Sequence, residues 1–372
     1  MSGIYVHLPF CPYICPYCDF AKWPLKRSSA ERYMRALKRE IEGAPPLRAR
    51  TLYFGGGTPN TYSAHDLGAL VERLQARFGP FSEVSIEVNP DLVTAEDLPE
   101  YVRAGVDRLS IGVQSMIDDE IRTLGRRHTA KDVARVAGAA RDAGFHSISM
   151  DLIFAVPGQT LDTWSQTLTK TIELESNHIS VYGLTIEEGT PFWQWREREP
   201  KAFFDDASEA ALYERAIAML AAAGYQQYEV SNFARPGHEC AHNLNYWQNG
   251  DYLGFGVGAA SYRAGVRSIH TRSLSEYLDA IESGQQIPSQ SEYLRDAART
   301  GEAAMLALRT KKGVQFADFN ARYGIDFLEF YAPVIGDLRA AGLLDVDEQA
   351  VRLTKRGLFL ANDVCGAFVT FA

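Results

Sequence analysis

Short apolar runs alternate with stretches of helical periodicity over the first half of the chain. The runs are rich in β-branched and aromatic residues, as strands are. They cover residues 4–7, 51–54, 84–88, 108–113, 147–153 and 178–182. Between the second and third runs, Leu67, Leu70 and Leu74 fall on one helical face. This alternation predicts strand–helix–strand units, and therefore a parallel sheet closed or half-closed into a (β/α) barrel.

Helix-start signals support the same division of the chain. Ser63 precedes Asp66 by three residues, and Thr94 precedes Asp97 by the same spacing, which is a variant of the capping box. A further helix is predicted over residues 207–223, where Gly224 supplies a stop.

The last part of the chain predicts a second, smaller unit. A polar stretch covers residues 283–292, and residues 300–372 have the pattern of a small helical domain. Residues 338–344 followed by 351–354 resemble the helix-then-wing order of winged helices. We therefore expect a barrel unit over residues 1–265 and a helical, winged-helix-like domain over residues 285–372.

Polar residues and glycines lie in or directly after all six predicted strands. They are Gly55, Gly56, Gly57, Thr58, Glu87, Asn89, Gln114, Asp151 and Thr185, with the cysteines following the first strand. The carboxyl ends of barrel strands form the active face, so polar residues there indicate a functional site.

Composition narrows the classes of protein that fit. Hydrophobic residues make up 46% and charged residues 23% of the 372 residues, an ordinary globular balance. The net charge of −9 argues against a nucleic-acid binder. We expect no membrane helix and no secretory signal. Five cysteines, three of them clustered, do not suit a disulfide framework, so a reducing cytoplasm is the expected location.

Cys11, Cys15 and Cys18 are the most informative residues of the chain. A structural zinc site would need a fourth ligand, and position 20 is Phe. Three unrelated core thiols within eight residues are improbable. Three thiolates hold three corners of a [4Fe–4S] cube and leave one iron open, which is the interpretation we favour.

A second segment carries His238, Cys240 and His242, followed by Tyr246 and Trp247. A histidine in such a segment is commonly a hydrogen-bonded core residue. A metal site from His238, Cys240 and His242 is the other simple interpretation, although no fourth ligand stands close in the sequence. The residues alone leave this choice open.

Taken together, the motifs resemble radical S-adenosylmethionine (SAM) proteins. The marks are Cys-x-x-x-Cys-x-x-Cys after a first strand and Gly-Gly-Gly-Thr-Pro after a second. Residues 5–11, 54–59, 110–115 and 151–153 resemble the oxygen-independent coproporphyrinogen III dehydrogenase group. The resemblance implies that SAM chelates the open iron and is cleaved by an electron from the cluster to a 5′-deoxyadenosyl radical.

The resemblance also implies a set of SAM contacts. They are Tyr5, Gly55, Gly56, Gly57, Thr58, Glu87, Gln114, Arg126 and Asp151. The glycine turn is expected to offer N–H groups to the amino and carboxylate end of SAM. The Arg126 fork suits a carboxylate, and Glu87 and Asp151 suit ribose hydroxyls or an ammonium group.

The stretch His242-Asn-Leu-Asn-Tyr246-Trp247 is similar to the His-Asn-x-x-Tyr-Trp motif of HemW-type haem chaperones, a branch of this group. This similarity implies that His242 ligates haem iron while Tyr246 and Trp247 stack on the porphyrin. The implied partners are haem, an acceptor haemoprotein or respiratory-chain component, and an electron donor such as flavodoxin or ferredoxin. Nucleic acid is not expected, and membrane contact is at most peripheral.

Two departures from the dehydrogenase branch bear on activity. That branch carries a fourth cysteine two residues after the third, where this chain has Phe20, and it has a longer segment before the cluster. The favoured hypothesis is therefore a haem chaperone with a [4Fe–4S] cluster and SAM. The alternatives are a coproporphyrinogen III oxidase, and another radical-SAM reaction on a different substrate.

Overall fold

The computed structural model describes residues 2–94 and 96–371, with the side chains of residues 370 and 371 left aside. All six predicted strands are confirmed, and they lie side by side and parallel in one sheet. They are β1 (Ser2–Leu8), β4 (Thr51–Gly56), β5 (Glu83–Val88), β6 (Arg108–Gln114), β7 (Ser147–Phe154) and β8 (His178–Gly183).

Strands that the sequence did not predict extend this sheet at both ends. β11 (Asp251–Phe255) pairs parallel to β1, and the hairpin strands β12 (Ala260–Arg263), β13 (Val266–His270) and β14 (Ser289–Tyr293) continue antiparallel beyond it. At the other end lie β10 (Asn232–Ala234) and β9 (Gln226–Gln227). The short pair β2 (Phe10–Cys11) and β3 (Trp23–Pro24) closes the cysteine loop.

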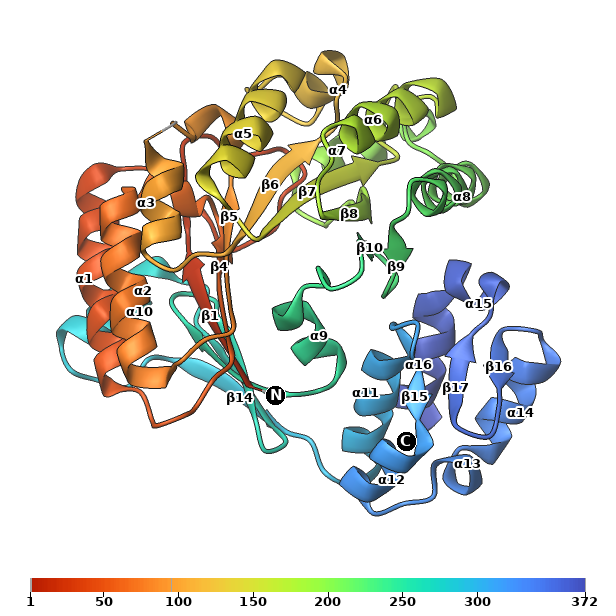
Figure 1. Ribbon diagram of the computed structural model, residues 1–372. Coiled ribbons are helices and arrows are strands. Elements are labelled where there is room, and N and C mark those ends of the chain that lie inside the picture. Colours follow the sequence, from red (N-terminus) through yellow and green to blue (C-terminus); the bar gives the residue numbers. More distant parts are fainter. Residues whose placement is uncertain (1, 95, 372) are drawn as a thin grey trace.

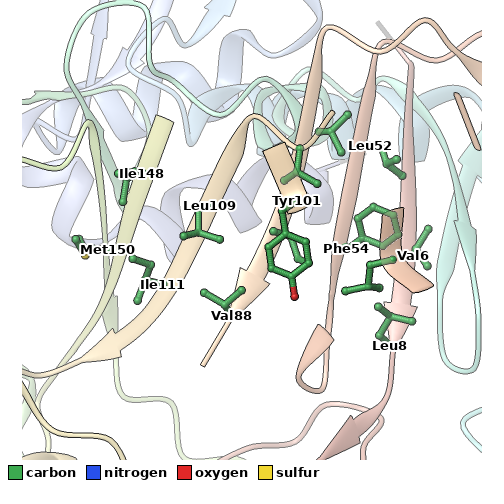
Figure 2. Close-up of a cluster of buried hydrophobic side chains, with 14 of the residues drawn as sticks. Val6, Leu8, Leu52, Phe54, Val88, Tyr101, Leu109, Ile111, Ile148 and Met150 are labelled. Atoms are coloured by element: carbon green, nitrogen blue, oxygen red, sulfur yellow. The ribbon is translucent and has the colours of Figure 1, made fainter. Parts of the chain in front are cut away.

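Helices cover the outer face of the curved sheet (Figure 1). Their bounds are α1 (Arg27–Gly43), η1 (Pro59–Thr61), α2 (Ala64–Phe78), η2 (Pro90–Leu92), α3 (Asp97–Arg103), α4 (Asp118–Thr123), α5 (Ala130–Ala143), α6 (Leu161–Glu173), α7 (Pro191–Arg198), η3 (Pro200–Ala202), α8 (Asp206–Ala222) and α10 (Leu274–Glu282). Leu52, Phe54, Leu109 and Ile111 belong to the buried layer between strands and helices (Figure 2). The open inner face of the sheet is left for polar residues.

The predicted helix starts are observed. The Ser63 hydroxyl accepts a hydrogen bond from the Asp66 N–H at 3.1 Å at the start of α2. Before α3, the Thr94 N–H and hydroxyl both donate to the Asp97 carboxylate, at 2.9 and 2.8 Å. These local contacts explain why α2 and α3 begin close to where the sequence pattern places them.

The C-terminal unit has a hydrophobic core of its own, from Ala303 to Phe368. Its elements are α11 (Asp296–Leu308), β15 (Val314–Gln315), α12 (Phe316–Tyr323), α13 (Phe327–Phe330), α14 (Ala332–Ala340), β16 (Leu344–Val346), β17 (Ala350–Leu353), α15 (Lys355–Phe359) and α16 (Ala361–Phe371). Helix α14 followed by the β16–β17 hairpin is the predicted helix-then-wing order.

The predicted border between the two units differs from the observed packing. Residues 266–293 form β13, α10 and β14, which continue the barrel sheet, so the stretch 285–293 belongs to the first unit. Every residue of β14 is exposed, and its sequence, SQSEY, has no apolar face. An edge strand exposed on both faces carries no hydrophobic alternation, which is why the sequence pattern predicted no strand there.

Helix α9 (Ala241–Trp247) lies apart from the outer layer. Figure 1 shows it between the inner side of the barrel strands and the C-terminal unit, and it packs against β1, β4 and α11. The segment with His242 and Tyr246 is thus placed inside the molecule and not on its rim.

Candidate functional site

The three cysteines lie around one cavity at the carboxyl ends of the parallel strands. Cys11 stands on β2, and its carbonyl accepts a hydrogen bond from the Leu25 N–H at 2.8 Å. The Cys18 N–H donates to the Cys15 carbonyl at 3.2 Å, which tightens the loop. All three sulfurs belong to free thiols, and all three residues line the same cavity of about 850 Å³.

This donor set fits an iron–sulfur cube better than a single ion. Among residues 2–94 and 96–371, no three His, Cys, Asp or Glu side chains converge closely enough to hold one metal ion. A [4Fe–4S] cluster bonds each thiolate to a different iron, so its ligands need to surround a space. Burial, with a further rise from the neighbouring thiols, raises the pKa of Cys11 and Cys18, so bound iron is what would hold them deprotonated.

The glycine turn after β4 holds the cysteine loop in place. The Gly57 N–H donates to the Leu8 carbonyl at 2.9 Å, and the Thr58 N–H donates to the Phe10 carbonyl at 3.0 Å. A Cβ at position 57 would lie 2.6 Å from the backbone of Pro9, so only glycine fits there.

One expectation for this turn is therefore corrected. The sequence predicted that the turn offers its N–H groups to SAM, but those of Gly57 and Thr58 are engaged by the strand that leads to Cys11. The Gly56 N–H is engaged by the Glu87 carboxylate. The Thr58 carbonyl is engaged as well, by the Thr61 N–H and hydroxyl, so this turn offers a ligand mainly the space that its glycines leave open.

Glu87 lies behind the turn and is half-buried, with its side chain on the cavity wall. Its Oε1 accepts a hydrogen bond from the Tyr53 hydroxyl at 2.9 Å, and a Cβ at Gly55 would come within 3.1 Å of its carboxylate. Burial raises the pKa of Glu87 to about 7, and the hydrogen bond from Tyr53 lowers it only in part. Glu87 is thus able to change protonation near neutral pH.

Arg126, Asn89 and Thr58 form a hydrogen-bonded chain across the cavity wall. Arg126 Nη1 donates to Asn89 Oδ1 at 2.6 Å, and Asn89 Nδ2 donates to Thr58 Oγ1 at 3.3 Å. Gln114 stands beside them at the end of β6 with a φ of 64°, a left-handed conformation that is uncommon for a residue other than glycine. Such backbone conformations are often found at functional sites.

Asp151 is held by three serines on neighbouring strands. It accepts hydrogen bonds from Ser110 Oγ at 2.6 Å, Ser180 Oγ at 2.8 Å and Ser149 Oγ at 3.2 Å. Burial raises the pKa of Asp151 in spite of these hydrogen bonds. The serines fix the carboxylate on the cavity wall.

The structure brings most of the predicted site together. Cys11, Cys15, Cys18, Gly56, Gly57, Thr58, Glu87, Gln114, Arg126 and Asp151 line the cysteine cavity. Tyr5 does not line it; its side chain lines a second cavity, and its hydroxyl lies 3.0 Å from His7 Nδ1.

Sequence reasoning gave no role to several residues that support this site. Asn89 was noticed only as a polar strand end, and Tyr53 and the three serines around Asp151 were not considered. The alternation of β6 and β7 carried part of the signal, because Ser110 and Ser149 lie two residues before Gly112 and Asp151, which line the cavity.

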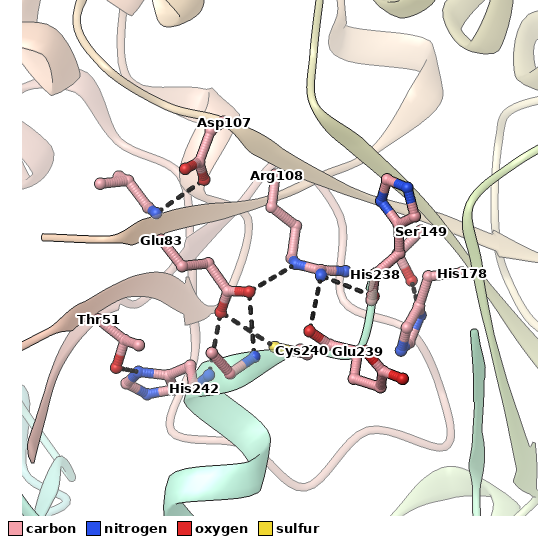
Figure 3. A network of polar contacts seen from close by, with 12 residues as sticks. Thr51, Glu83, Asp107, Arg108, Ser149, His178, His238, Glu239, Cys240 and His242 are labelled. Carbon is pink, nitrogen blue, oxygen red and sulfur yellow. Dashed lines mark hydrogen bonds and ion pairs between the residues drawn. The ribbon is translucent and has the colours of Figure 1, made fainter. Parts of the chain in front are cut away.

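His242 lies in a buried polar network that includes Thr51, Glu83 and Arg108 (Figure 3). The Glu83 carboxylate accepts hydrogen bonds from the His242 N–H at 2.9 Å and the Ala241 N–H at 3.0 Å, which fixes the start of α9. Arg108 Nε lies 3.1 Å from Glu83 Oε2, and its Nη2 donates to the carbonyls of His238 and Glu239.

Both ring nitrogens of His242 are hydrogen-bonded. Nδ1 lies 2.8 Å from Thr51 Oγ1, and Nε2 lies 2.9 Å from the Tyr246 hydroxyl. The ring stacks on Tyr53 and is 1% exposed, and burial lowers its pKa to about 3. His242 is therefore a neutral, enclosed imidazole that lines neither cavity.

The partial barrel, its three-cysteine loop and the surrounding rim define the radical SAM class. The profile of the Radical SAM superfamily matches residues 5–170, and that of the HemN C-terminal domain matches residues 296–360. "Heme chaperone HemW" of Bacillus subtilis is 37% identical, with 99% of each chain covered. The same-named protein of Escherichia coli is 38% identical over 69% of each chain. The chain belongs to the HemW family.

The solved structure of coproporphyrinogen III oxidase (HemN) from Escherichia coli, a radical SAM enzyme, confirms the predicted fold class. It superposes with a TM-score of 0.85 at 25% sequence identity, covering 100% of this chain and 90% of that chain. Among the helices that the structure describes, none has the length and apolar character required to span a membrane.

Proposed function

We propose that this protein is a haem chaperone that binds haem and transfers it to an acceptor protein. The proposal is supported by the HemW relatives that match almost the whole chain and by the His242–Trp247 segment, which is held against the barrel strands. The proposed acceptor is a haemoprotein or a respiratory-chain component. The proposed location is the cytoplasm.

The second part of the proposal concerns the cluster and SAM. Cys11, Cys15 and Cys18 hold a [4Fe–4S] cluster, which supplies a single electron to SAM when both are bound. Arg126 orients the carboxylate of SAM, and Asp151 and Glu87 accept hydrogen bonds from its hydroxyl or ammonium groups. A flavodoxin or ferredoxin is the proposed electron donor.

For haem, the sequence prediction makes His242 the ligand of the iron. The imidazole is neutral, as a ligand must be, and Nε2 is the nitrogen that would bind iron. This ligation requires the Tyr246 hydroxyl to leave Nε2 first. His242 as a haem ligand stays a prediction.

One experiment tests the proposed function against its main alternative. The protein is reconstituted anaerobically with iron and sulfide, and haem binding is followed by absorption while carbon dioxide release from coproporphyrinogen III is measured. We expect stoichiometric haem binding, transfer of that haem to an apo-haemoprotein, and no carbon dioxide release. Absence of haem binding, or turnover of coproporphyrinogen III, would contradict the chaperone function.

A further inference from the structure

A second cavity, of about 670 Å³, is lined by the C-terminal end of α9 and by residues 19–21, which follow the third cysteine. Its volume falls within the range of ~300–1,000 Å³ that is typical of small-molecule sites. The side chains that line it include Tyr246, Trp247, Tyr252, Tyr262 and Met305. This wall has the composition that a flat, apolar ring system requires.

The aromatic side chains of the wall form an ordered series. Tyr246 packs edge-on against Tyr252, with ring centroids 4.7 Å apart, and Tyr252 stacks on Tyr262 at 6.4 Å. In the described part of the chain, the Trp247 Nε1–H and the Tyr262 hydroxyl are buried without a hydrogen-bond partner. Buried polar groups without partners are rare, and here two of them belong to the wall of one cavity.

Charged groups at the same cavity suit a ligand that carries carboxylates. Arg267 and Arg272 line it, and each is paired with an acidic residue, Glu302 and Asp19 respectively. Both arginine side chains are partly exposed, at 32% and 59%. The two carboxylates of haem are able to exchange into these pairs at the entrance.

The relative positions of the His242 and Tyr246 side chains determine which of them can bind haem iron in this cavity. The two residues are one helical turn apart, so Tyr246 Oη lies 2.9 Å from His242 Nε2. Tyr246 lines the cavity and His242 does not. Haem iron in this cavity would therefore contact the Tyr246 hydroxyl, because His242 is enclosed behind Tyr246.

We propose that ferric haem binds in this cavity, with Tyr246 as the axial ligand of the iron and His242 as a positioning residue. The inference rests on the proposed haem-binding function and refines its site. Tyrosine is an established type of haem ligand, and a hydrogen-bonded neighbour orients such a ligand and adjusts its basicity.

The ligation step balances without an oxidant or reductant. Ferric haem with a bound hydroxide reacts with the phenol of Tyr246. An iron–phenolate bond forms as the iron–hydroxide bond breaks. The released hydroxide takes up the phenol proton and leaves as water. His242 stays neutral: its Nε2–H donates to the phenolate oxygen while its Nδ1 accepts a hydrogen bond from the Thr51 hydroxyl.

The site also adjoins the cysteine cavity. Asp19 and Phe20 line both cavities, and the Phe20 side chain is 66% exposed. Haem in the second cavity would thus lie next to the loop that carries Cys18. This position gives the cluster site a direct way to influence haem binding or release.

The test uses the full-length protein titrated with ferric haem and examined by absorption and resonance Raman spectroscopy. We expect the wild-type complex to show iron–tyrosinate vibrations. Tyr246→Phe is expected to lose them and to bind haem at least 10-fold more weakly. Tyr293→Phe removes an exposed tyrosine hydroxyl that lines neither cavity, and it is expected to keep both the vibrations and the affinity.

His242→Gln separates a positioning residue from a ligand. The glutamine amide still donates a hydrogen bond, so we expect weaker haem binding with the tyrosinate vibrations retained. A wild-type complex without these vibrations, or a Tyr246→Phe complex with an unchanged spectrum, overturns the inference while leaving haem binding intact. A wild-type protein that binds no haem contradicts the proposed function itself. Circular dichroism checks that each variant is folded.

Discussion

Glu83 and Arg108 form a buried ion pair between neighbouring parallel strands, with 3.1 Å between Glu83 Oε2 and Arg108 Nε. The pair joins the barrel to the segment that carries the haem motif, because Glu83 receives the first N–H groups of α9 and Arg108 holds the carbonyls before it. The position of His242 and Tyr246 therefore depends on two residues at the beginnings of β5 and β6.

Glu83→Ala is expected to destabilise the protein strongly. Removing one partner of a buried ion pair leaves the other charge uncompensated, which costs about 3–5 kcal/mol. The free energy of unfolding, measured by denaturant titration, should fall by that amount, and haem affinity should fall with it because α9 loses its anchor. Glu214→Gln breaks an exposed pair with Lys355 and is the matched control, with an expected midpoint close to wild type.

Cys15→Ser is expected to prevent assembly of the cluster. The hydroxyl of serine is a much poorer iron ligand than a thiolate, so a cube held by only two cysteines should be lost or strongly depleted. Iron and acid-labile sulfide are measured after anaerobic reconstitution. Cys365→Ser, a buried thiol in the core of the C-terminal unit, should keep the wild-type iron content. Full iron in the Cys15 variant would exclude this residue as a ligand.

Arg126→Lys is expected to weaken SAM binding by about 10–100-fold. The lysine keeps the charge but loses the fork that binds a carboxylate, and it also loses the contact with Asn89. Calorimetric titration of the reconstituted protein with SAM measures the effect. Arg122→Lys, on the exposed face of α4, should bind SAM as the wild type does.

Much of the barrel could be predicted because its parallel strands are buried and bounded by helices. Each strand therefore appears in the sequence as a short, continuous apolar run. The cluster ligands followed from the spacing of the three cysteines. Thr58, Glu87 and Asp151 followed from their places in or after strands and from the family resemblance, and all of these residues line one cavity. β11 was missed because a five-residue strand that contains Gly254 gives little pattern, and its partner β1 lies far away in sequence.

The haem motif shows where sequence reasoning was insufficient. The spacing of His242 and Tyr246 already indicates that the two side chains meet on one helical face. It does not tell which of them faces solvent and which faces the core. That orientation depends on long-range contacts with Thr51 and Glu83, which are about 190 and 160 residues away in the chain and have no local signature.

Stability should change with pH through Glu40. This carboxyl group is buried against the Tyr277 hydroxyl, at 2.6 Å, and the Gly256 N–H, at 2.9 Å, and burial raises its pKa from 4.5 to about 7. His270 lies 3.4 Å away, but burial lowers its pKa, so it does not supply a compensating charge at neutral pH.

The sign follows from proton binding. Between pH ~5 and ~7 the folded state keeps the Glu40 proton that the unfolded state has lost, so this contribution to stability falls as the pH rises. We expect wild type to lose roughly 2–3 kcal/mol relative to Glu40→Gln across this window. Denaturant unfolding at several pH values measures the difference. Glu42→Gln, on the exposed side of α1, should show the same change of unfolding free energy with pH as the wild type.

Gly56→Ala should disturb the cysteine loop from a distance. Gly56 has a φ of 110°, and a Cβ there would lie 2.4 Å from His7 Nδ1, a ring whose Nε2 in turn lies 2.7 Å from the Ala21 carbonyl after the third cysteine. Backbone strain alone costs about 1–3 kcal/mol, and the clash adds to it. We expect a lower unfolding midpoint and incomplete iron incorporation on reconstitution. Gly43→Ala, with no atom within 4 Å of the added Cβ, should change neither quantity, and equal behaviour of the two variants would show that the glycine turn does not support the cluster loop.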